Sequence, residues 1–224
     1  MQGLFSNFKI QINENIYLKD PESSKLGKKI IDHSILLIDE IGFEHFTFKK
    51  LADKIGSTES SIYRYFENKH QLLVYLTDWY WSWMEYKLVF NTHNMSNPSS
   101  KLELALEIVT MAPEKDENFS HINEVVLGSI VISEFSKSYL TKEVDQENKE
   151  GYFATFKRLV GRVAQFITEV NPQYPHPRSL VSTVIQGALH QQYSKAHLPS
   201  LTDFNDNKEL VDFYKQLVLT QINA

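Results

Sequence analysis

The feature that most constrains this chain is a glycine between two short stretches of helical apolar periodicity, in residues 47–69 (TFKKLADKIGSTESSIYRYFENK). Thr47 stands before the first stretch, and its side-chain oxygen can cap the orphan N–H groups of a helix start. Gly56 can enter the left-handed region at no steric cost, so it ends this helix. Thr58 is then well placed to cap a second helix. The stretch therefore predicts a helix–turn–helix.

The second helix of this pair has a narrow apolar side, formed by Ile62 and Phe66. Its outward residues are short or hydrogen-bonding: Glu59, Ser60, Tyr63 and Arg64. Such side chains can approach base edges, and the second helix of a helix–turn–helix lies in the major groove of DNA. An arginine there can pair bidentately with guanine or grip a phosphate. The pattern indicates a DNA-reading element.

Several short motifs surround this element: Gly42-Phe43 before Phe46-Thr47, Leu51-Ala52, Ile55-Gly56, Ile62-Tyr63-Arg64-Tyr65-Phe66, Asn68-Lys69 and Leu72-Leu73. With them, roughly residues 25–75 resemble the N-terminal DNA-binding domain of the tetracycline-repressor (TetR) family of bacterial transcriptional regulators. In that family the aromatic run closes the recognition helix, and the Asn/Lys-x-x-Leu-Leu pattern begins the next helix. The rest of the chain is similar to the family only in length and helicity.

The resemblance implies phosphate contacts for Thr47 and Lys69, and groove contacts for Ser60, Ser61, Tyr63 and Arg64. A lysine at a helix start also brings free N–H groups to a phosphate. Glu59 departs from the family, where many relatives carry a basic or neutral residue. It can accept from cytosine N4, or it can discourage nonspecific binding. The complete set of expected DNA contacts is Thr47, Lys49, Thr58, Glu59, Ser60, Ser61, Tyr63, Arg64 and Lys69.

Net charge is −5, which does not by itself favour a DNA partner. Residues 25–70 hold eight basic against seven acidic side chains, a net of +1, so the acidity lies mainly in the remainder. Residues 25–70, called the head below, are therefore nearly neutral. This predicts modest nonspecific affinity for phosphates, with a few cations positioning the protein on DNA.

The periodicities predict an all-α protein of about nine helices. We expect residues 1–24 to be an extension, residues 25–70 the helix–turn–helix domain, and residues 71–224 a helical body for ligand binding and dimerisation. In the extension, Phe8 to Ile12 alternate like a short strand. The extension is either an arm that touches DNA or a partner, or a segment that packs on the body or is partly disordered.

A long aromatic helix is expected over residues 69–91, and the resemblance implies that it links head to body and transmits ligand binding. Its aromatic side chains either line a pocket or form ordinary core. The expected pocket residues are Trp79, Trp83, Tyr86, His121 and Phe156. By position alone, the resemblance places a four-helix dimer interface on the last two helices, through Val181, Val184, Ile185, Ala188, Leu210, Phe213, Tyr214 and Leu217.

Catalytic and metal sites have little support. No P-loop, G-x-S-x-G motif or dinucleotide fingerprint occurs, so we expect neither an enzyme nor a cofactor. The eight histidines are scattered, and only a site assembled from distant His121 and His190 stays open. The chain has no cysteine, no apolar run long enough for a membrane span and no signal-like N-terminus, so we expect a cytoplasmic protein.

The sequence thus predicts a ligand-responsive DNA-binding transcriptional regulator, a repressor that binds a palindromic operator as a homodimer. Its ligand is expected to be a small hydrophobic or aromatic molecule of unknown identity. The alternative is a helical ligand- or partner-binding regulatory protein without specific DNA binding. Glu59 and the weakly basic head favour that alternative.

Overall fold

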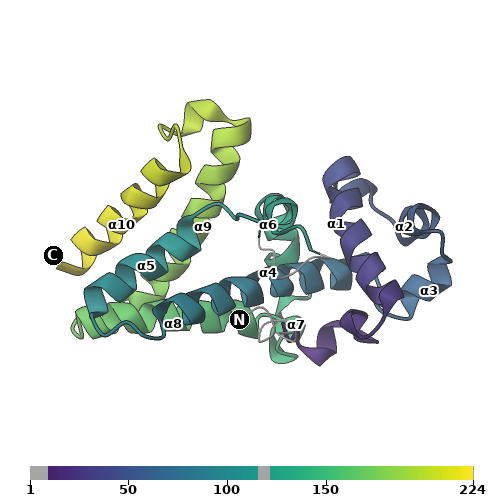
Figure 1. Cartoon of the computed structure of the whole chain (residues 1–224), viewed down its shortest axis with the longest axis horizontal. Helices are drawn as coiled ribbons and strands as arrows, with labels where there is room; N and C mark the ends of the chain where they lie inside the picture. The colour runs from purple at the N-terminus through teal and green to yellow at the C-terminus, as the bar shows by residue number, and fades with distance from the viewer. Residues whose placement is uncertain (1–9, 116–121, 224) are drawn as a thin grey trace. The chain divides into compact units, whose positions relative to one another are not determined.

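The computed structural model describes residues 10–115 and 122–223, and every regular element in those ranges is a helix (Figure 1). The α-helices are α1 (Lys25–His45), α2 (Phe48–Ile55), α3 (Glu59–Tyr63), α4 (Lys69–Thr92), α5 (Pro98–Thr110), α6 (Glu124–Tyr139), α7 (Val144–Lys149), α8 (Ala154–Val170), α9 (Pro177–His197) and α10 (Asn207–Asn223). Three 3-10 turns are η1 (Glu14–Ile16), η2 (Pro21–Ser23) and η3 (Pro199–Leu201). The all-α prediction is confirmed, with ten α-helices in the described ranges.

One expected helix is divided in two. The apolar pattern predicts a single helix from residue 147 to residue 170, whereas the chain breaks between α7 and α8 at Gly151, where φ is +84°. The left-handed backbone at this position favours glycine. The side-chain nitrogen Nδ2 of Asn13 would lie 2.9 Å from a Cβ at Gly151.

The chain forms two compact units, and their boundary crosses α4. The first unit comprises Met1–Ser82 and Pro113–Ala154, and the second comprises Trp83–Ala112 and Thr155–Ala224. The first unit therefore contains α1 to α3 together with α6 and α7. The expected functional division at residue 70 follows the sequence motif, whereas these units follow the packing.

The N-terminal extension packs within the first unit. Ile10, Ile12 and Ile16 are buried, and residues 10–12 form no strand. Phe8 and Lys9 of the expected strand lie outside the described residues. A Cβ at Gly27 of α1 would lie only 2.1 Å from the carbonyl oxygen of Pro21, so the extension meets α1 where only a glycine leaves room.

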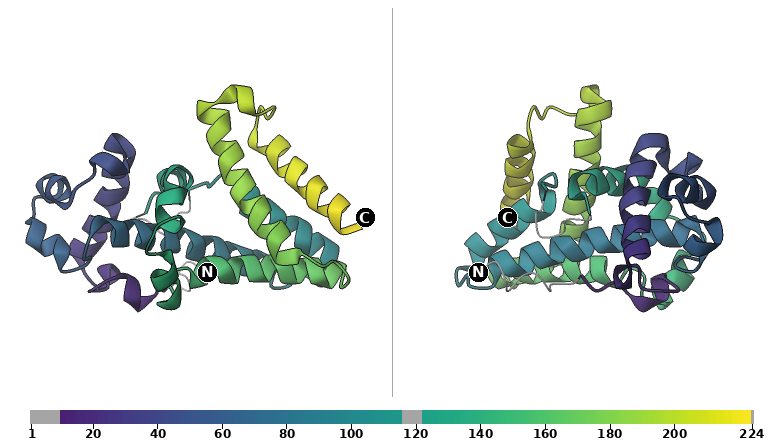
Figure 2. Two further views of the ribbon diagram at one scale, coloured as in Figure 1. Left: turned by 180° about the vertical axis from the view of Figure 1, so that it is seen from behind. Right: turned by 45° about the vertical axis from the view of Figure 1, so that its right-hand side comes forward.

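In the second unit, α9 and α10 run antiparallel (Figure 2). A Cβ at Gly187 would lie 2.6 Å from the hydroxyl of Tyr214, which shows how closely the two helices approach. The buried carboxylate of Glu85 joins α4 to α8. It accepts from Arg158 Nη2 at 2.6 Å and from Arg162 Nε at 2.6 Å. Among the helices of the described ranges, we find none with the length and apolarity that a membrane span requires.

Candidate nucleic-acid interface

The helix α2 has the ends that its sequence predicts. The hydroxyl of Thr47 accepts from the N–H of Lys50 at 3.2 Å, and Gly56 closes the helix at φ +63° and ψ +43°, in the left-handed region. Between them, Phe48, Leu51, Ala52 and Ile55 are buried. The apolar face of α2 packs against the neighbouring helices of the head, and its other face is exposed to solvent or to a binding partner.

The helix α3 is short, and its cap is a small hydroxyl cluster. Thr58 Oγ1 accepts from the N–H of Ser61 at 3.3 Å and lies within hydrogen-bond distance of Ser60 Oγ (3.0 Å) and Ser61 Oγ (2.8 Å). The helix ends at Tyr63, with Arg64 as its C-cap residue. Ile62 is fully buried beneath it. The expected aromatic closure is present, because Tyr65 and Phe66 are also buried.

The predicted reading residues emerge on the outer side of α3. Ser60 and Arg64 are exposed, Glu59 and Ser61 are partly exposed, and Tyr63 is 47% exposed. The Tyr63 ring packs edge-on against Phe48 at 5.0 Å between ring centres. A ring held in this way presents its hydroxyl at a fixed place, as a reader of base edges or phosphates requires.

The two lysines of the expected interface differ in their surroundings. Lys49 is exposed, and its ammonium has no hydrogen bond or ion pair among the described residues. The ammonium of Lys69, in contrast, donates to the carbonyls of Phe43 (3.0 Å), Glu44 (3.2 Å) and Phe46 (3.3 Å). Its donors are directed at the carbonyls near the end of α1, so the side chain of Lys69 ties α4 to α1.

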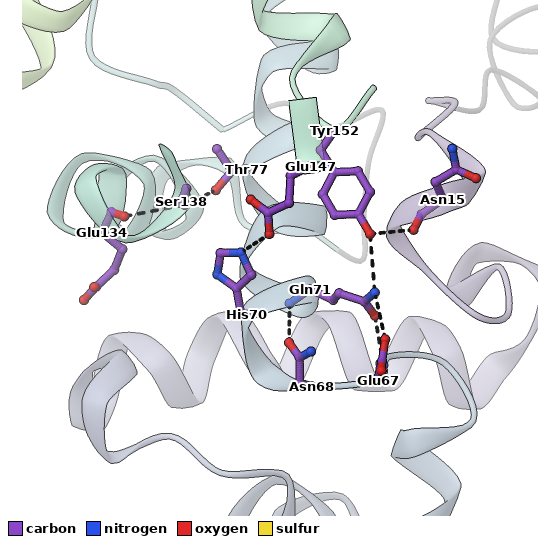
Figure 3. A network of polar contacts seen from close by, with 10 residues as sticks. All are labelled: Asn15, Glu67, Asn68, His70, Gln71, Thr77, Glu134, Ser138, Glu147 and Tyr152. Atoms are coloured by element: carbon purple, nitrogen blue, oxygen red, sulfur yellow. Dashed lines mark hydrogen bonds and ion pairs between the residues drawn. The ribbon is translucent and has the colours of Figure 1, made fainter. Parts of the chain in front are cut away.

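A polar network connects the start of α4 to α7 and to the extension, all within the first unit (Figure 3). His70 Nε2 lies 2.6 Å from Glu147 Oε1, and Gln71 Nε2 lies 3.5 Å from the Tyr152 hydroxyl. That hydroxyl donates to the carbonyl of Asn15 at 2.9 Å. Burial raises the pKa of Tyr152 above its usual value, so this donor stays protonated near neutral pH.

Further bonds position the head from α6 and from the extension. Lys137 Nζ lies 2.7 Å from Glu44 Oε1, and its hydrogen bond lowers the pKa of that exposed carboxyl. The N–H of Leu18 donates to the carbonyl of Tyr65 at 2.8 Å. Sequence reasoning missed these positioning residues, because their partners are distant in the sequence and no spacing pattern marks them.

The structure places most expected dimer residues inside the second unit. The buried ones are Val181, Val184, Ile185, Ala188, Leu210 and Tyr214. Only Phe213 (47% exposed) and Leu217 (42% exposed) face outward. The six buried side chains pack between the chain's own helices, so they are not available to a second subunit.

The expected ligand residues have different surroundings. His121 lies outside the described residues, which also leaves the His121–His190 pair without a structural description. Trp79 is buried in the first unit and Trp83 in the second, and Tyr86 is half-buried. Phe156 lines a cavity of about 300 Å³ in the second unit, with Lys157, Val160, Arg178, Ser179 and Ser182. No group of three or more His, Asp or Glu side chains suited to a metal ion occurs within residues 10–115 and 122–223.

The fold has counterparts among solved structures. The fatty acid degradation regulator FadR from Bacillus halodurans superposes with a TM-score of 0.60 at 19% identity, over 85% of this chain and 96% of that chain. AibR in complex with isovaleryl coenzyme A and operator DNA gives a TM-score of 0.58 at 13% identity, over 85% and 97%. The superantigen PfiT gives 0.57 at 14% identity, over 90% and 97%. At these identities the likeness concerns the fold, which hosts more than one function.

Sequence comparison is more specific for the head. No curated protein matches the chain. Residues 30–76 match the bacterial regulatory proteins of the tetR family, and these residues include α2, α3 and the start of α4. The matched segment has the capped helix–turn–helix and the exposed outer face described above. On this evidence residues 30–76 form a helix–turn–helix segment that matches the tetR family of bacterial regulatory proteins.

Proposed function

We propose that this TetR-family regulator recognises a specific operator by placing α3 in the major groove. The observation that carries the proposal is that α3 has one buried side and one exposed side. Ile62 is buried against the head, whereas Ser60, Tyr63 and Arg64 face outward from a helix held by the Thr58 cap. Arg64 supplies base or phosphate contacts, and exposed Lys49 and Thr47 supply phosphate contacts.

The role of Lys69 in this proposal is restricted to its backbone. Its ammonium is engaged with carbonyls of the α1 end, but its N–H lies in the first turn of α4, where a phosphate can be bound. Ser61 is similar, because its hydroxyl lies in the Thr58 cap cluster. We assign both residues to positioning, and sequence discrimination to Arg64, Tyr63 and Ser60.

The regulator acts as a homodimer on a palindromic operator, since two-fold proteins read two-fold sites. The exposed apolar residues Phe213 and Leu217 on α10 support an interface there. Tyr193 on α9 is exposed as well, at 37%. Dimerisation would bury these side chains without any change in the core of the subunit. Such a protein works where chromosomal DNA is, in the cytoplasm.

Repression is relieved by a small molecule that binds the second unit. The cavity in the second unit is lined by the apolar side chains of Phe156 and Val160 and by the cationic side chains of Lys157 and Arg178. That composition suits an apolar molecule bearing a carboxylate or phosphate, and AibR has been seen with isovaleryl coenzyme A. A coupling of about 1–3 kcal/mol between ligand and operator suffices for a switch, provided that the ligand prefers one state.

Footprinting tests the proposal. The full-length protein is titrated onto genomic fragments, starting with the DNA upstream of its own gene, at several salt concentrations. We expect a protected inverted repeat whose affinity falls as salt rises. Absence of any protected repeat at moderate salt would favour the alternative, a helical regulator without specific DNA binding. Release of a protected repeat by short-chain acyl thioesters or carboxylates would support the ligand class.

A further inference from the structure

The N-terminal extension is hydrogen-bonded to the turn between α7 and α8, within the first unit. The side-chain amides of Asn13 and Asn15 both donate to the carbonyl oxygen of Glu150, at 3.0 Å and 2.9 Å. The hydroxyl of Tyr152 donates in return to the carbonyl of Asn15 at 2.9 Å (Figure 3). Glu150 and Tyr152 flank Gly151, the glycine at which the expected helix breaks. One side of the extension is therefore fixed to this turn.

The same extension is also hydrogen-bonded to the residue that follows α3 and its C-cap. The N–H of Leu18 donates to the carbonyl of Tyr65 at 2.8 Å, and Ser24 Oγ lies 2.8 Å from the Tyr65 hydroxyl. The N–H of Tyr65 itself donates to the carbonyl of Ile62 in α3, at 2.8 Å. Tyr65 is thus bonded both to the extension and to the helix that carries the predicted reading residues.

The segment between these two attachments is itself well anchored. Ile12 and Ile16 are buried, and the side chain of Asn13 caps the 3-10 turn η1 by accepting from the N–H of Asn15 at 3.0 Å. Residues 12–24 are called the brace below. A segment with buried anchors and its own cap resists local opening, so a displacement at one end reaches the other.

We propose that Asn13 and Asn15 are positioning residues for α3, acting through the brace. Their bonds to Glu150 fix the brace at the α7–α8 turn, and the bonds at Tyr65 pass that position on to α3. A change in the α7–α8 turn consequently alters how firmly the end of α3 is held. The consequence for operator binding rests on the proposed function, whereas the link from the turn to Tyr65 does not.

Amide hydrogen exchange of the full-length protein, followed by NMR without DNA or ligand, tests the link. The double variant Asn13→Ser with Asn15→Ala removes both amide donors, and serine still supplies a capping oxygen for η1. The reporters are the N–H groups of Tyr65 and Phe66, which donate to the carbonyl of Ile62 at 2.8 Å and 3.2 Å. We expect both amides to exchange about threefold to tenfold faster, as the loss of hydrogen bonds at a distance of many residues requires.

A second amide separates transmission through the brace from general loosening. The N–H of Ser57 donates to the carbonyl of Ala52 at 2.9 Å, at the end of α2 in the same head, and its exchange should stay unchanged. Equal acceleration at Ser57 and Tyr65, or unchanged exchange at Tyr65, would overturn the proposal. Asn15→Ala alone changes an exposed side chain, so it tests the same direction in a protein that keeps its core.

The matched control removes a different bond of the same partner. Gln146 is exposed, and its Nε2 donates to Glu150 Oε1 at 2.6 Å, on the side chain rather than the carbonyl that holds the brace. Gln146→Ala should leave the exchange of Tyr65 and Phe66 as in the parent protein. Acceleration of these amides by Gln146→Ala, equal to that in the double variant, would contradict the role of Asn13 and Asn15.

Operator binding provides a further measurement. On a footprinted inverted repeat, the double variant at Asn13 and Asn15 should bind about threefold to tenfold more weakly, and Gln146→Ala should bind like the parent protein. Faster exchange at Tyr65 with unchanged operator affinity would contradict the positioning role. If the parent protein protects no repeat, the proposed function fails, and the exchange at Tyr65 still decides whether the brace transmits the position of the turn.

Discussion

The ammonium of Lys69 donates to the carbonyl oxygen of Phe43 at 3.0 Å and lies 4.8 Å from the centre of the Phe43 ring. The two residues are 26 positions apart and belong to different helices, α4 and α1. A cation beside the last carbonyls of a helix is electrostatically favourable. The residue that the family resemblance assigns to a phosphate is therefore a structural link inside the head.

Replacement of Lys69 by alanine should lower the stability of the protein. The three carbonyls near the end of α1 lose a charged donor, and we expect a loss of about 1–3 kcal/mol in the free energy of unfolding. Urea denaturation at neutral pH measures it. Lys49→Ala is the matched control, because Lys49 is exposed and its ammonium has no partner among the described residues.

The same pair of variants separates the two lysines on DNA. Lys49→Ala should keep its stability and make the dependence of log affinity on log salt shallower by about one unit. If Lys69→Ala instead kept full stability and changed the salt slope by that amount, its side chain would contact phosphate after all.

Replacement of Arg64 by alanine should weaken the operator complex by about 1–3 kcal/mol and relax the preference at one base pair. Arg64 is exposed, and its guanidinium has no bond to the described residues, so the melting temperature should not change. Binding to a set of single-base operator variants measures the preference. Arg64→Lys keeps the charge without the bidentate geometry. Full recovery by lysine would reassign Arg64 to phosphate contact.

Glu85 makes stability depend on pH in the acidic range. Burial opposes its ionisation, but hydrogen bonds from Arg158 and Arg162 outweigh burial and hold its pKa below the usual 4.5. A lowered carboxyl pKa means that this stabilisation is present above about pH 4.5 and is lost as pH falls through the lower folded-state value. Glu85→Gln cannot titrate, so the difference in unfolding free energy between the two proteins should shrink below about pH 4.5.

At neutral pH, Glu85→Gln should cost about 1–3 kcal/mol, less than a fully buried pair, because both arginine side chains are nearly half exposed. Glu169→Gln is the control. Its partner Lys101 lies 3.4 Å away, and a pair at the surface contributes under about 1 kcal/mol. Denaturant unfolding of the three proteins at several pH values between roughly pH 3 and pH 7 measures these differences in unfolding free energy. A constant difference over that range would contradict the role of Glu85.

Leu217→Glu should dissociate the dimer and leave the subunit folded. The side chain is 42% exposed in the single chain, so a charge there meets water in the monomer but is desolvated at an interface. Sedimentation velocity measures the mass, and circular dichroism checks the helices. Val89→Glu, at an exposed apolar position of α4, is the control and should remain dimeric. Dimers that persist in both variants would move the interface away from α10.

Local signals in the sequence were sufficient for the head. Thr47, Gly56 and Thr58 cap the helices where expected, because a cap depends on atoms within three residues of it. The family motifs added the role of the outer face, and residues 30–76 match the tetR family, as the resemblance implies. What each outward side chain contacts on DNA stays a prediction.

Long-range packing limited the rest. Helical periodicity identifies both Val184 and Phe213 as apolar positions. It does not show that Val184 is buried within its own chain whereas Phe213 is exposed and available to a partner. The bonds of Lys69 depend on where α1 ends, which lies far from α4 in the sequence.

The close packing of Pro21 against Gly27 has a practical consequence for chimeric regulators, in which the DNA-binding head is exchanged so that the same ligand-binding domain acts at a new promoter. A graft that begins at Lys25 would separate Gly27 and Tyr65 from the extension that they contact. The transplanted portion should instead carry residues 10–24 along with the helix–turn–helix. Reporter strains with the two fusion junctions would then differ in basal expression even with the same promoter.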